Sequence, residues 1–159
     1  MKSIYLLLVP LLIFAGFKQN PKVTVGKATA ATEKITDSLH PVRDGLFIHI
    51  SSGYDNPHKA LMPLKMAVMM ADVKDVAVYM DIEAVKMVLK DSKDMAYDNF
   101  PNLKDLLAQL VAKKVLIMAC PTCLRVAGKG ENDLIKGVIL SDKEKFFSFT
   151  KGKITSLDY

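Results

Sequence analysis

Cys120 and Cys123 are the residues of this chain whose type and spacing point most directly to chemistry, because they form one C-x-x-C pair directly after an apolar run. The thiolate is the nucleophilic form of cysteine, and a free thiol with a pKa of about 8.5 is mostly protonated at neutral pH. Pro121 is typical of the first position of a helix, where unpaired backbone N–H groups favour an anion. We therefore expect Cys120 to be the nucleophile, with a lowered pKa, and Cys123 to attack a mixed disulfide or persulfide formed on it.

The residues alone also allow the cysteine pair to be a structural disulfide or two inert buried thiols. In either case the protein is a non-catalytic module that binds a small ligand or another protein. A zinc site is less favoured, because a structural site needs four nitrogen or sulfur ligands. Besides the two cysteines, the chain has three histidines without a paired spacing: His40, His49 and His58. We expect no metal and no cofactor.

The segments around the cysteines alternate between strand and helix patterns. Apolar runs at 46–50, 76–82, 115–119, 138–140 and 154–159 predict five strands, and helical patterns lie at 57–73, 83–90, 101–111, 121–127 and 132–136. Pro63 is expected to kink the first helix or delay its start. Ser141 to Glu144 has the pattern of a capping box before a last helix. This alternation predicts an α/β fold with three α/β/α layers around a mostly parallel five-stranded sheet, layered as in flavodoxin.

Two polar loops follow predicted strands and therefore lie at the carboxyl edge of the sheet, where such folds bind ligands. The residues expected to line a ligand pocket there are Ser52, Gly53, Tyr54, Asn56 and His58 from the first loop, and Pro121, Thr122 and Arg125 from the cysteine loop. The same residue types are also common as turn formers, helix caps and solvated side chains. His49, on the first strand, is either a proton acceptor for the cysteines or a hydrogen-bonded core residue.

The first 17 residues have the pattern of a signal peptide or an N-terminal anchor. Met1-Lys2 supplies positive charge, and the apolar stretch from Ile4 to Phe17 is too short to span a bilayer comfortably. Export, to the periplasm or beyond, is the favoured prediction, and an uncleaved anchor is the alternative. Residues 18–44 are rich in Lys, Thr and Ala and are predicted to be a flexible linker. The folded domain is predicted to span residues 45–159.

Composition and charge narrow the range of partners. The net charge of +5 comes from 22 basic and 17 acidic residues that are mixed along the chain, without a basic stripe, so no nucleic-acid partner is expected. No apolar run reaches the roughly 18–20 residues of a membrane span, so no membrane contact is expected beyond the N-terminal segment. The predicted helix at 58–72 is apolar on more than one face. A helix apolar all round is normally buried, so we expect a homo-oligomer.

Two stretches of the chain resemble the DsrE-like (DsrE/DsrF-like) family of sulfur-relay proteins. The first strand, turn and helix of that family resemble HISSGYDNPHKALMPLKMAVMMAD, and its third strand, cysteine loop and fourth strand resemble VLIMACPTCLRVAGKGENDLIKGVIL. The resemblance covers about Leu46 to Tyr159. Its most specific part is a strand that ends in Cys120, a Gly eight residues later, and the Asp-Leu-Ile and Gly-Val segments that follow.

The resemblance implies a small α/β domain that assembles as a trimer or hexamer. By motif position it implies that Cys120 is the sulfur-carrying residue and that Cys123 matches the second cysteine of the C-x-x-C subset. Some members carry persulfides in sulfur oxidation or in transfer-RNA thiolation, which implies a sulfur donor or acceptor protein as a partner. This chain departs from the cytoplasmic relay members in its export-like N-terminus. It also has Lys113-Lys114 where a Gly usually precedes the third strand.

Overall fold

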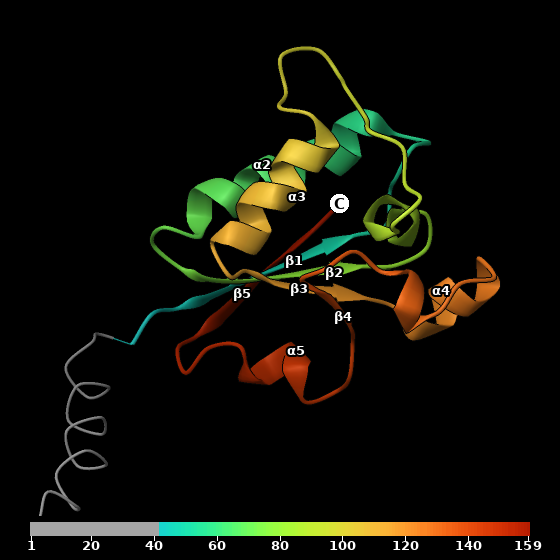
Figure 1. The fold of residues 1–159 in the computed structure, drawn as a ribbon. Coiled ribbons are helices and arrows are strands. Elements are labelled where there is room, and N and C mark those ends of the chain that lie inside the picture. Colours follow the sequence, from blue (N-terminus) through green and yellow to red (C-terminus); the bar gives the residue numbers. More distant parts are fainter. Residues whose placement is uncertain (1–41) are drawn as a thin grey trace, which may run out of the picture. The chain divides into compact units, whose positions relative to one another are not determined.

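The apolar runs predicted as strands form a sheet of five parallel strands in the computed structural model, which describes residues 42–159 (Figure 1). The strands are β1 (Gly45–Ile50), β2 (Asp75–Met80), β3 (Leu116–Ala119), β4 (Val138–Leu140) and β5 (Ile154–Asp158). Their order across the sheet is β4-β3-β2-β1-β5. Every neighbouring pair is parallel, so the predicted α/β class is confirmed with a sheet that is parallel throughout.

Helices cover both faces of this sheet and complete the three predicted layers. On one face lie α2 (Pro57–Met70) and α3 (Leu103–Ala112), and on the opposite face lies the short α5 (Lys145–Ser148) (Figure 1). Helix α4 (Pro121–Val126) begins directly after β3, at the carboxyl edge. The remaining helical turns are the 3-10 helices η1 (Ala84–Val88) and η2 (Glu131–Asp133), so the helix predicted at 83–90 is a 3-10 helix. The loops after β1, β2 and β3 therefore meet at one edge of the sheet.

Helix α2 contains Pro63 in its interior, and the predicted delay of its start is wrong. The helix begins at Pro57 because Asn56 caps it: the Asn56 side chain accepts a hydrogen bond from the Lys59 N–H at 3.2 Å. A proline at the first helical position loses no hydrogen bond, because its N–H has no intrahelical partner in any case. The predicted first residue of this helix is confirmed.

Two further local predictions are wrong. The helix expected at 132–136 is only the single turn η2, because Leu134 leaves it to pair with Leu89 in an antiparallel bridge. At the start of α5 the capping side chain is Asp142, whose Oδ1 accepts two backbone N–H groups at 3.0 Å, and not Ser141. At Leu134 a tertiary pairing decided the backbone, whereas at α5 the choice lay between two neighbouring residues that can both cap a helix.

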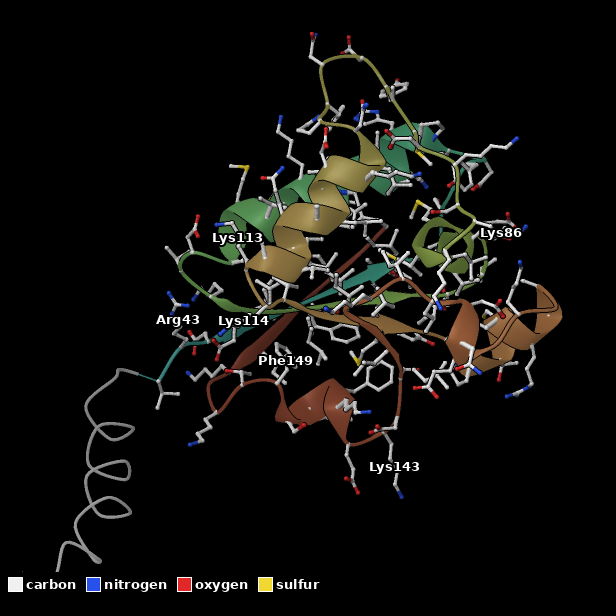
Figure 2. All side chains as sticks on the ribbon, viewed as in Figure 1. Arg43, Lys86, Lys113, Lys114, Lys143 and Phe149 are labelled. Carbon is white, nitrogen blue, oxygen red and sulfur yellow. The ribbon has the colours of Figure 1, made fainter. Side chains whose placement is uncertain are left out.

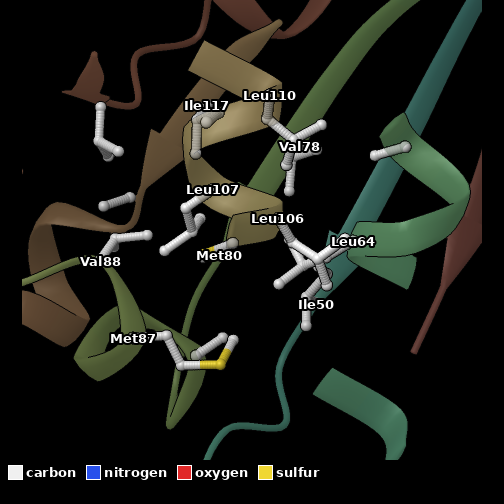
Figure 3. Packing of buried hydrophobic residues seen from close by; sticks show 14 of the residues in the cluster. Ile50, Leu64, Val78, Met80, Met87, Val88, Leu106, Leu107, Leu110 and Ile117 are labelled. Atoms are coloured by element: carbon white, nitrogen blue, oxygen red, sulfur yellow. The ribbon is translucent and has the colours of Figure 1, made fainter. Parts of the chain in front are cut away.

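The main core lies between the sheet and the layer formed by α2 and α3 (Figure 3). Ile50 and Met80 at the carboxyl ends of β1 and β2 are fully buried, as is Leu64 on α2. Helix α3 buries the leucine stripe predicted from its spacing: Leu103, Leu106, Leu107 and Leu110. Burial of apolar surface, at about 25 cal/mol per Å², is what holds the helices on the sheet and fixes the strand ends that carry the polar loops.

The N-terminal predictions fall mostly outside the described residues. The signal or anchor at 1–17 and the linker up to residue 41 lie there, and only 42–44 of the predicted linker is described. Here Arg43 donates a hydrogen bond to the Asp72 carbonyl at 2.5 Å, and an Asp44 carboxylate oxygen accepts one from the Lys153 N–H at 3.1 Å. The chain is thus tied to the domain just before β1. Within residues 42–159 no helix has the length and apolar character needed to cross a membrane.

Cationic side chains are spread over separate parts of the domain (Figure 2). Arg43, Lys113 and Lys114 lie together at one edge, whereas Lys86 lies near α4 and Lys143 near α5. Several are paired with carboxylates: Lys113 with Asp72, and Lys86 with Glu83 at 2.7 Å. Exposed pairs of this kind contribute about 0–1 kcal/mol each, so they shape the charge of the surface more than the stability of the fold.

Candidate active site at the carboxyl edge of the sheet

The cysteine loop joins the end of β3 to the first turn of α4. Cys120 follows β3 directly, where its N–H donates to the Met80 carbonyl at 2.9 Å. The same residue caps α4: its Sγ accepts the N–H of Cys123 at 3.3 Å, and Pro121 is the first helical residue. Both cysteines are free thiols and both are half-buried. The chain therefore places the Cys120 sulfur at the unpaired amides of a helix start, as the sequence predicted.

The two thiols have opposite pKa shifts. Burial raises the pKa of the Cys120 thiol, but hydrogen bonds to its sulfur from Cys123, from the hydroxyl of Tyr79 and from the Thr122 N–H outweigh burial and leave its pKa below the usual value. The pKa of Cys123 is raised, first by burial and then because its thiol donates to Cys120. Of the two sulfurs, Cys120 is thus the one that ionises first, which is the order expected from the sequence.

A row of polar and aromatic side chains crosses the sheet toward Cys120. Parallel pairing sets Asp158 of β5 beside His49 of β1, His49 beside Tyr79 of β2, and Tyr79 beside Met118 of β3. Residues two apart on a strand share a face, so Cys120 lies on the same face as Met118. This is the face that carries α5, and the row ends at the Cys120 sulfur.

His49 lies between two carboxylates. Its Nε2 is 2.9 Å from Oδ2 of Asp81, its Nδ1 is 2.7 Å from Oδ1 of Asp158, and its ring stacks on Tyr79 with centroids 5.4 Å apart. The contact with Asp81 is not an aligned hydrogen bond: within residues 42–159, Nε2 and the buried Oδ1 of Asp81 have no such partner. His49 stands one strand away from the cysteine loop, with Tyr79 between them. The expected role as a hydrogen-bonded core residue is wrong, because the His49 side chain is 28% exposed. His49 is a half-buried histidine between two carboxylates.

A cavity of about 310 Å³ opens beside Cys123, between η1 and α4. It is lined by Ile82, Glu83, Lys86, Cys123, Val126 and Ala127. Ile82 is 61% exposed and Val126 is 85% exposed, so two bare aliphatic side chains flank the thiol. A second cavity of about 690 Å³ shares Lys86 and Ala127 with the first and extends to Tyr54. A reactant of small size therefore has space next to the cysteine pair, on the side of Cys123.

The residue Ile82 has an unusual backbone at this cavity. Its φ is +43°, in the left-handed region that β-branched residues rarely adopt. The Ile82 N–H interacts with the Cys123 sulfur, an interaction that acts to lower the pKa of that thiol. Such conformations cost on the order of 1–3 kcal/mol and persist where the surroundings fix them. The strained backbone of Ile82 thus directs its N–H at the Cys123 sulfur.

The residues of the first loop that were predicted to line a pocket have different structural roles. Gly53 is buried against Glu83: a Cβ there would lie 2.7 Å from the Glu83 carbonyl oxygen, so only glycine fits. Tyr54 lines the larger cavity, and its hydroxyl donates to the Lys93 carbonyl at 2.6 Å. Asn56 caps α2, and the half-buried Ser52 lines neither of the two cavities.

His58 lies apart from the cysteine pair. It is exposed at the start of α2, where its ring stacks on Tyr97 at 5.3 Å and meets Phe100 at 5.5 Å. It lines neither of the two cavities described above. The structure therefore gives His58 an aromatic packing role and does not bring it to the sulfurs.

In the cysteine loop, Arg125 is exposed, Lys129 is half-buried, and both side chains are already paired. Arg125 donates to the Thr122 hydroxyl at 3.1 Å within α4. Lys129, just beyond α4, forms an ion pair with Asp91 at 2.6 Å. Among the described residues no group of three or more His, Cys, Asp or Glu side chains is arranged to hold a metal ion. The groups nearest the sulfurs are instead backbone donors and the Tyr79 hydroxyl.

Sequence reasoning missed three residues of the site: Tyr79, Asp81 and Ile82. All three lie at the carboxyl end of β2, in the middle of the sheet, next to β3. The available signal was the polar alternation within VAVYMDI, which puts Tyr79 and Asp81 on one face of a strand. This alternation points to the cysteine site only once β2 is known to lie beside β3.

The fold and site define a three-layer α/β domain with a thiol pair at the carboxyl edge of a parallel sheet. The model of the DsrE/DsrF-like family matches residues 44–151, and the chain belongs to this family. Among solved structures it is similar to the ychN protein from E. coli, with 19% identity, a TM-score of 0.58, and coverage of 75% of this chain and 100% of that one.

A second solved structure has the same fold. The protein of unknown function MTH1491 from Methanobacterium thermoautotrophicum matches with 17% identity and a TM-score of 0.50, over 74% of this chain and 99% of that one. No curated protein matches the chain significantly. The comparisons thus establish the family and the sulfur-relay type of fold.

Proposed function

We propose that this protein carries sulfur as a persulfide, or exchanges thiols, through Cys120, with Cys123 as the resolving cysteine. The observation that carries the proposal is the capping geometry of Cys120. Its sulfur sits at the start of α4 and accepts the Cys123 N–H at 3.3 Å, which favours the thiolate at that position. Membership in the DsrE/DsrF-like family supports sulfur chemistry of this kind.

The proposed reaction balances without a cofactor. The Cys120 thiolate attacks the outer sulfur of a donor persulfide, R–S–S–H; a new S–S bond forms on Cys120, the donor S–S bond breaks, and R–S⁻ leaves. The Cys123 thiolate then attacks the inner sulfur on Cys120, which forms the Cys120–Cys123 disulfide and releases HS⁻. An acceptor thiolate that attacks the outer sulfur instead takes the sulfur and returns Cys120 to a thiolate. The donor or acceptor is a partner protein or a small persulfide.

The cavity beside Cys123 supports access by such a reactant. Its volume of about 310 Å³ suits a small thiol or the tip of a partner's loop, and the bare Ile82 and Val126 side chains provide apolar contact. The same cavity supports the second candidate function, a non-catalytic module that binds a small ligand or a protein there. In that case the thiols take no part and react only when the chain unfolds.

Thiol alkylation of the native protein as a function of pH decides between the two functions. Because the pKa of Cys120 lies below its usual value, alkylation should stay fast at pH values where an ordinary thiol is protonated. The rate should fall only as the pH drops below the lowered pKa. Intact mass after treatment with a persulfide donor should show one added sulfur, about +32 Da. Thiols that react only after denaturation would support the binding module.

We also propose that the protein is exported, on the strength of the apolar segment Ile4 to Phe17 behind Met1-Lys2. An oxidising compartment would let the Cys120–Cys123 disulfide persist, and a dithiol partner protein would have to be oxidised to return both residues to thiols. The intact mass of protein taken from its own cell envelope reads out the cleavage point directly. A full-length mass in the envelope fraction would indicate an uncleaved anchor, and a full-length soluble cytoplasmic protein would contradict export.

A homo-oligomer is proposed from the apolar surface that the domain leaves uncovered. Met69 on α2 is 62% exposed, and Val73 just beyond that helix is 61% exposed. Phe147 of α5 is 74% exposed on the opposite layer. We expect light scattering at micromolar concentration to give the mass of a trimer, the number that the family resemblance favours. A stable monomer under these conditions would contradict the proposal.

A further inference from the structure

Tyr79 is the polar side chain of the sheet that reaches the nucleophilic sulfur. It lies on β2 beside Met118 of β3, and Cys120 lies two residues beyond Met118 on the same face. A tyrosine is long enough to span this diagonal, and its hydroxyl interacts with the Cys120 sulfur. Strand register thus brings the Tyr79 side chain to the sulfur that caps α4.

The ring of Tyr79 is held from several sides. It stacks on His49 at 5.4 Å, meets Phe146 edge-on at 4.9 Å and lies 6.3 Å from Phe47. Aromatic pairs at these separations contribute about 0.5–1.5 kcal/mol each beyond area burial, so they restrict the ring. His49 is itself held between Asp81 and Asp158. The hydroxyl is therefore positioned before any reactant arrives.

We propose that Tyr79 is a further catalytic residue, whose hydroxyl donates a hydrogen bond to the Cys120 thiolate and then to the sulfur that this thiolate acquires. The inference rests on the proposed function of Cys120. In the attack on a donor persulfide, Cys120 loses its negative charge as the new S–S bond forms and R–S⁻ leaves. The outer sulfur arrives as S–H and passes its proton to the departing R–S⁻. The Tyr79 O–H then donates to the resulting persulfide anion on Cys120 without transferring its own proton.

The charges around Tyr79 are consistent with a donor that stays protonated. Burial, its contact with Cys120 and the nearby Asp81 raise the pKa of Tyr79, so the phenol is neutral throughout the working range. The titratable groups that face the Cys120–Tyr79 pair are Cys123 from α4, Asp81 directly after β2, and, beyond Tyr79, His49 from β1 and Asp158 from β5. Cys120 therefore loses its proton while the Tyr79 phenol stays protonated.

The test is the substitution Tyr79→Phe in the full chain, made in a Cys123→Ser background so that Cys120 is the only thiol left. Phenylalanine keeps the ring contacts and removes the hydroxyl. Hydrogen bonds to charged groups are the stronger ones, and we expect the pKa of Cys120, followed by thiolate absorbance near about 240 nm, to rise by about one unit. At a pH below the Cys120 pKa of both the parent and the Tyr79→Phe variant, the variant should be alkylated about tenfold more slowly. The rate constant per Cys120 thiolate should be unchanged.

Tyr97→Phe in the same background is the matched control, because Tyr97 is 40% exposed and packs on His58, away from the sulfurs. It should titrate like the parent. A Tyr79→Phe protein that is less thermally stable but has the parent's Cys120 pKa would overturn the inference and leave Tyr79 a packing residue. If Cys120 of the parent itself titrates and reacts like a free thiol, the proposed function fails, and that result is separate from any effect of Tyr79.

Discussion

Cys120→Ser is expected to abolish labelling of the native protein by a limiting electrophile or a persulfide donor at pH 6–7, a loss of at least about a hundredfold in rate. The thiolate is the reactive form, and only Cys120 has a pKa held below the usual value by donors at a helix start. Cys123 has a raised pKa and stays protonated in this range. Mass spectrometry after a timed quench measures both the rate and the position of the adduct.

Cys123→Ser is the matched variant, because it removes the other thiol of the same turn. It should retain the fast labelling of Cys120 and should accumulate the persulfide or mixed disulfide that the parent resolves. The Ser hydroxyl can still donate to the Cys120 sulfur, so the first step is preserved. Equal labelling of the two single variants, or faster labelling of Cys120→Ser, would show that the assigned roles are wrong and that the helix start does not activate Cys120.

Leu106→Ala is expected to lower the free energy of unfolding by about 2–5 kcal/mol, because truncation of a fully buried leucine removes apolar contact and leaves a cavity. Leu106 is 1% exposed on α3 and lies in the cluster with Ile50 and Leu64 (Figure 3). Since domains of this size are stable by about 5–15 kcal/mol, the variant should lose a large share of its stability. Urea denaturation followed by circular dichroism measures the change.

The control for this variant is Gln109→Ala on the exposed side of the same helix. Alanine is the better helix former, so stability should change by no more than about 0.5 kcal/mol. A Leu106→Ala protein with the denaturation midpoint of the parent would mean that α3 is not packed on the sheet as described. An equal loss of unfolding free energy in both variants would mean that the substitutions act on the stability of helix α3 and not on packing of the core.

The fold was predictable where the sequence carries an unbroken periodic signal. The leucine spacing of α3 and the apolar runs of β1 and β3 each identify their element without reference to the rest of the chain. Prediction failed where two local solutions have similar free energies. The segment 132–136 has helix formers, yet the pairing of Leu134 with Leu89, far away in sequence, decides its backbone.

The site, like the fold, was predictable where local sequence determines it and not where distant segments do. Two of the donors that lower the pKa of Cys120, Cys123 and Thr122, lie within one turn of it, so strand, proline and helix start were enough to predict the direction. The contribution of Tyr79 depends on strand order and register, which no local pattern contains. His58 was expected in the pocket because it follows the β1 loop, but Tyr97 and Phe100 from a distant loop pack against it.

The pairing of β5 with β1 has a consequence for how the domain forms. β1 is the first strand of the domain and β5 is its last, yet they are neighbours in register from Gly45 to His49. A chain emerging from the ribosome at about 5–20 residues per second therefore holds one side of β1 unpaired until nearly the whole domain has been made. A bare strand edge is a template for aggregation, so the nascent chain depends on chaperone cover or on rapid completion.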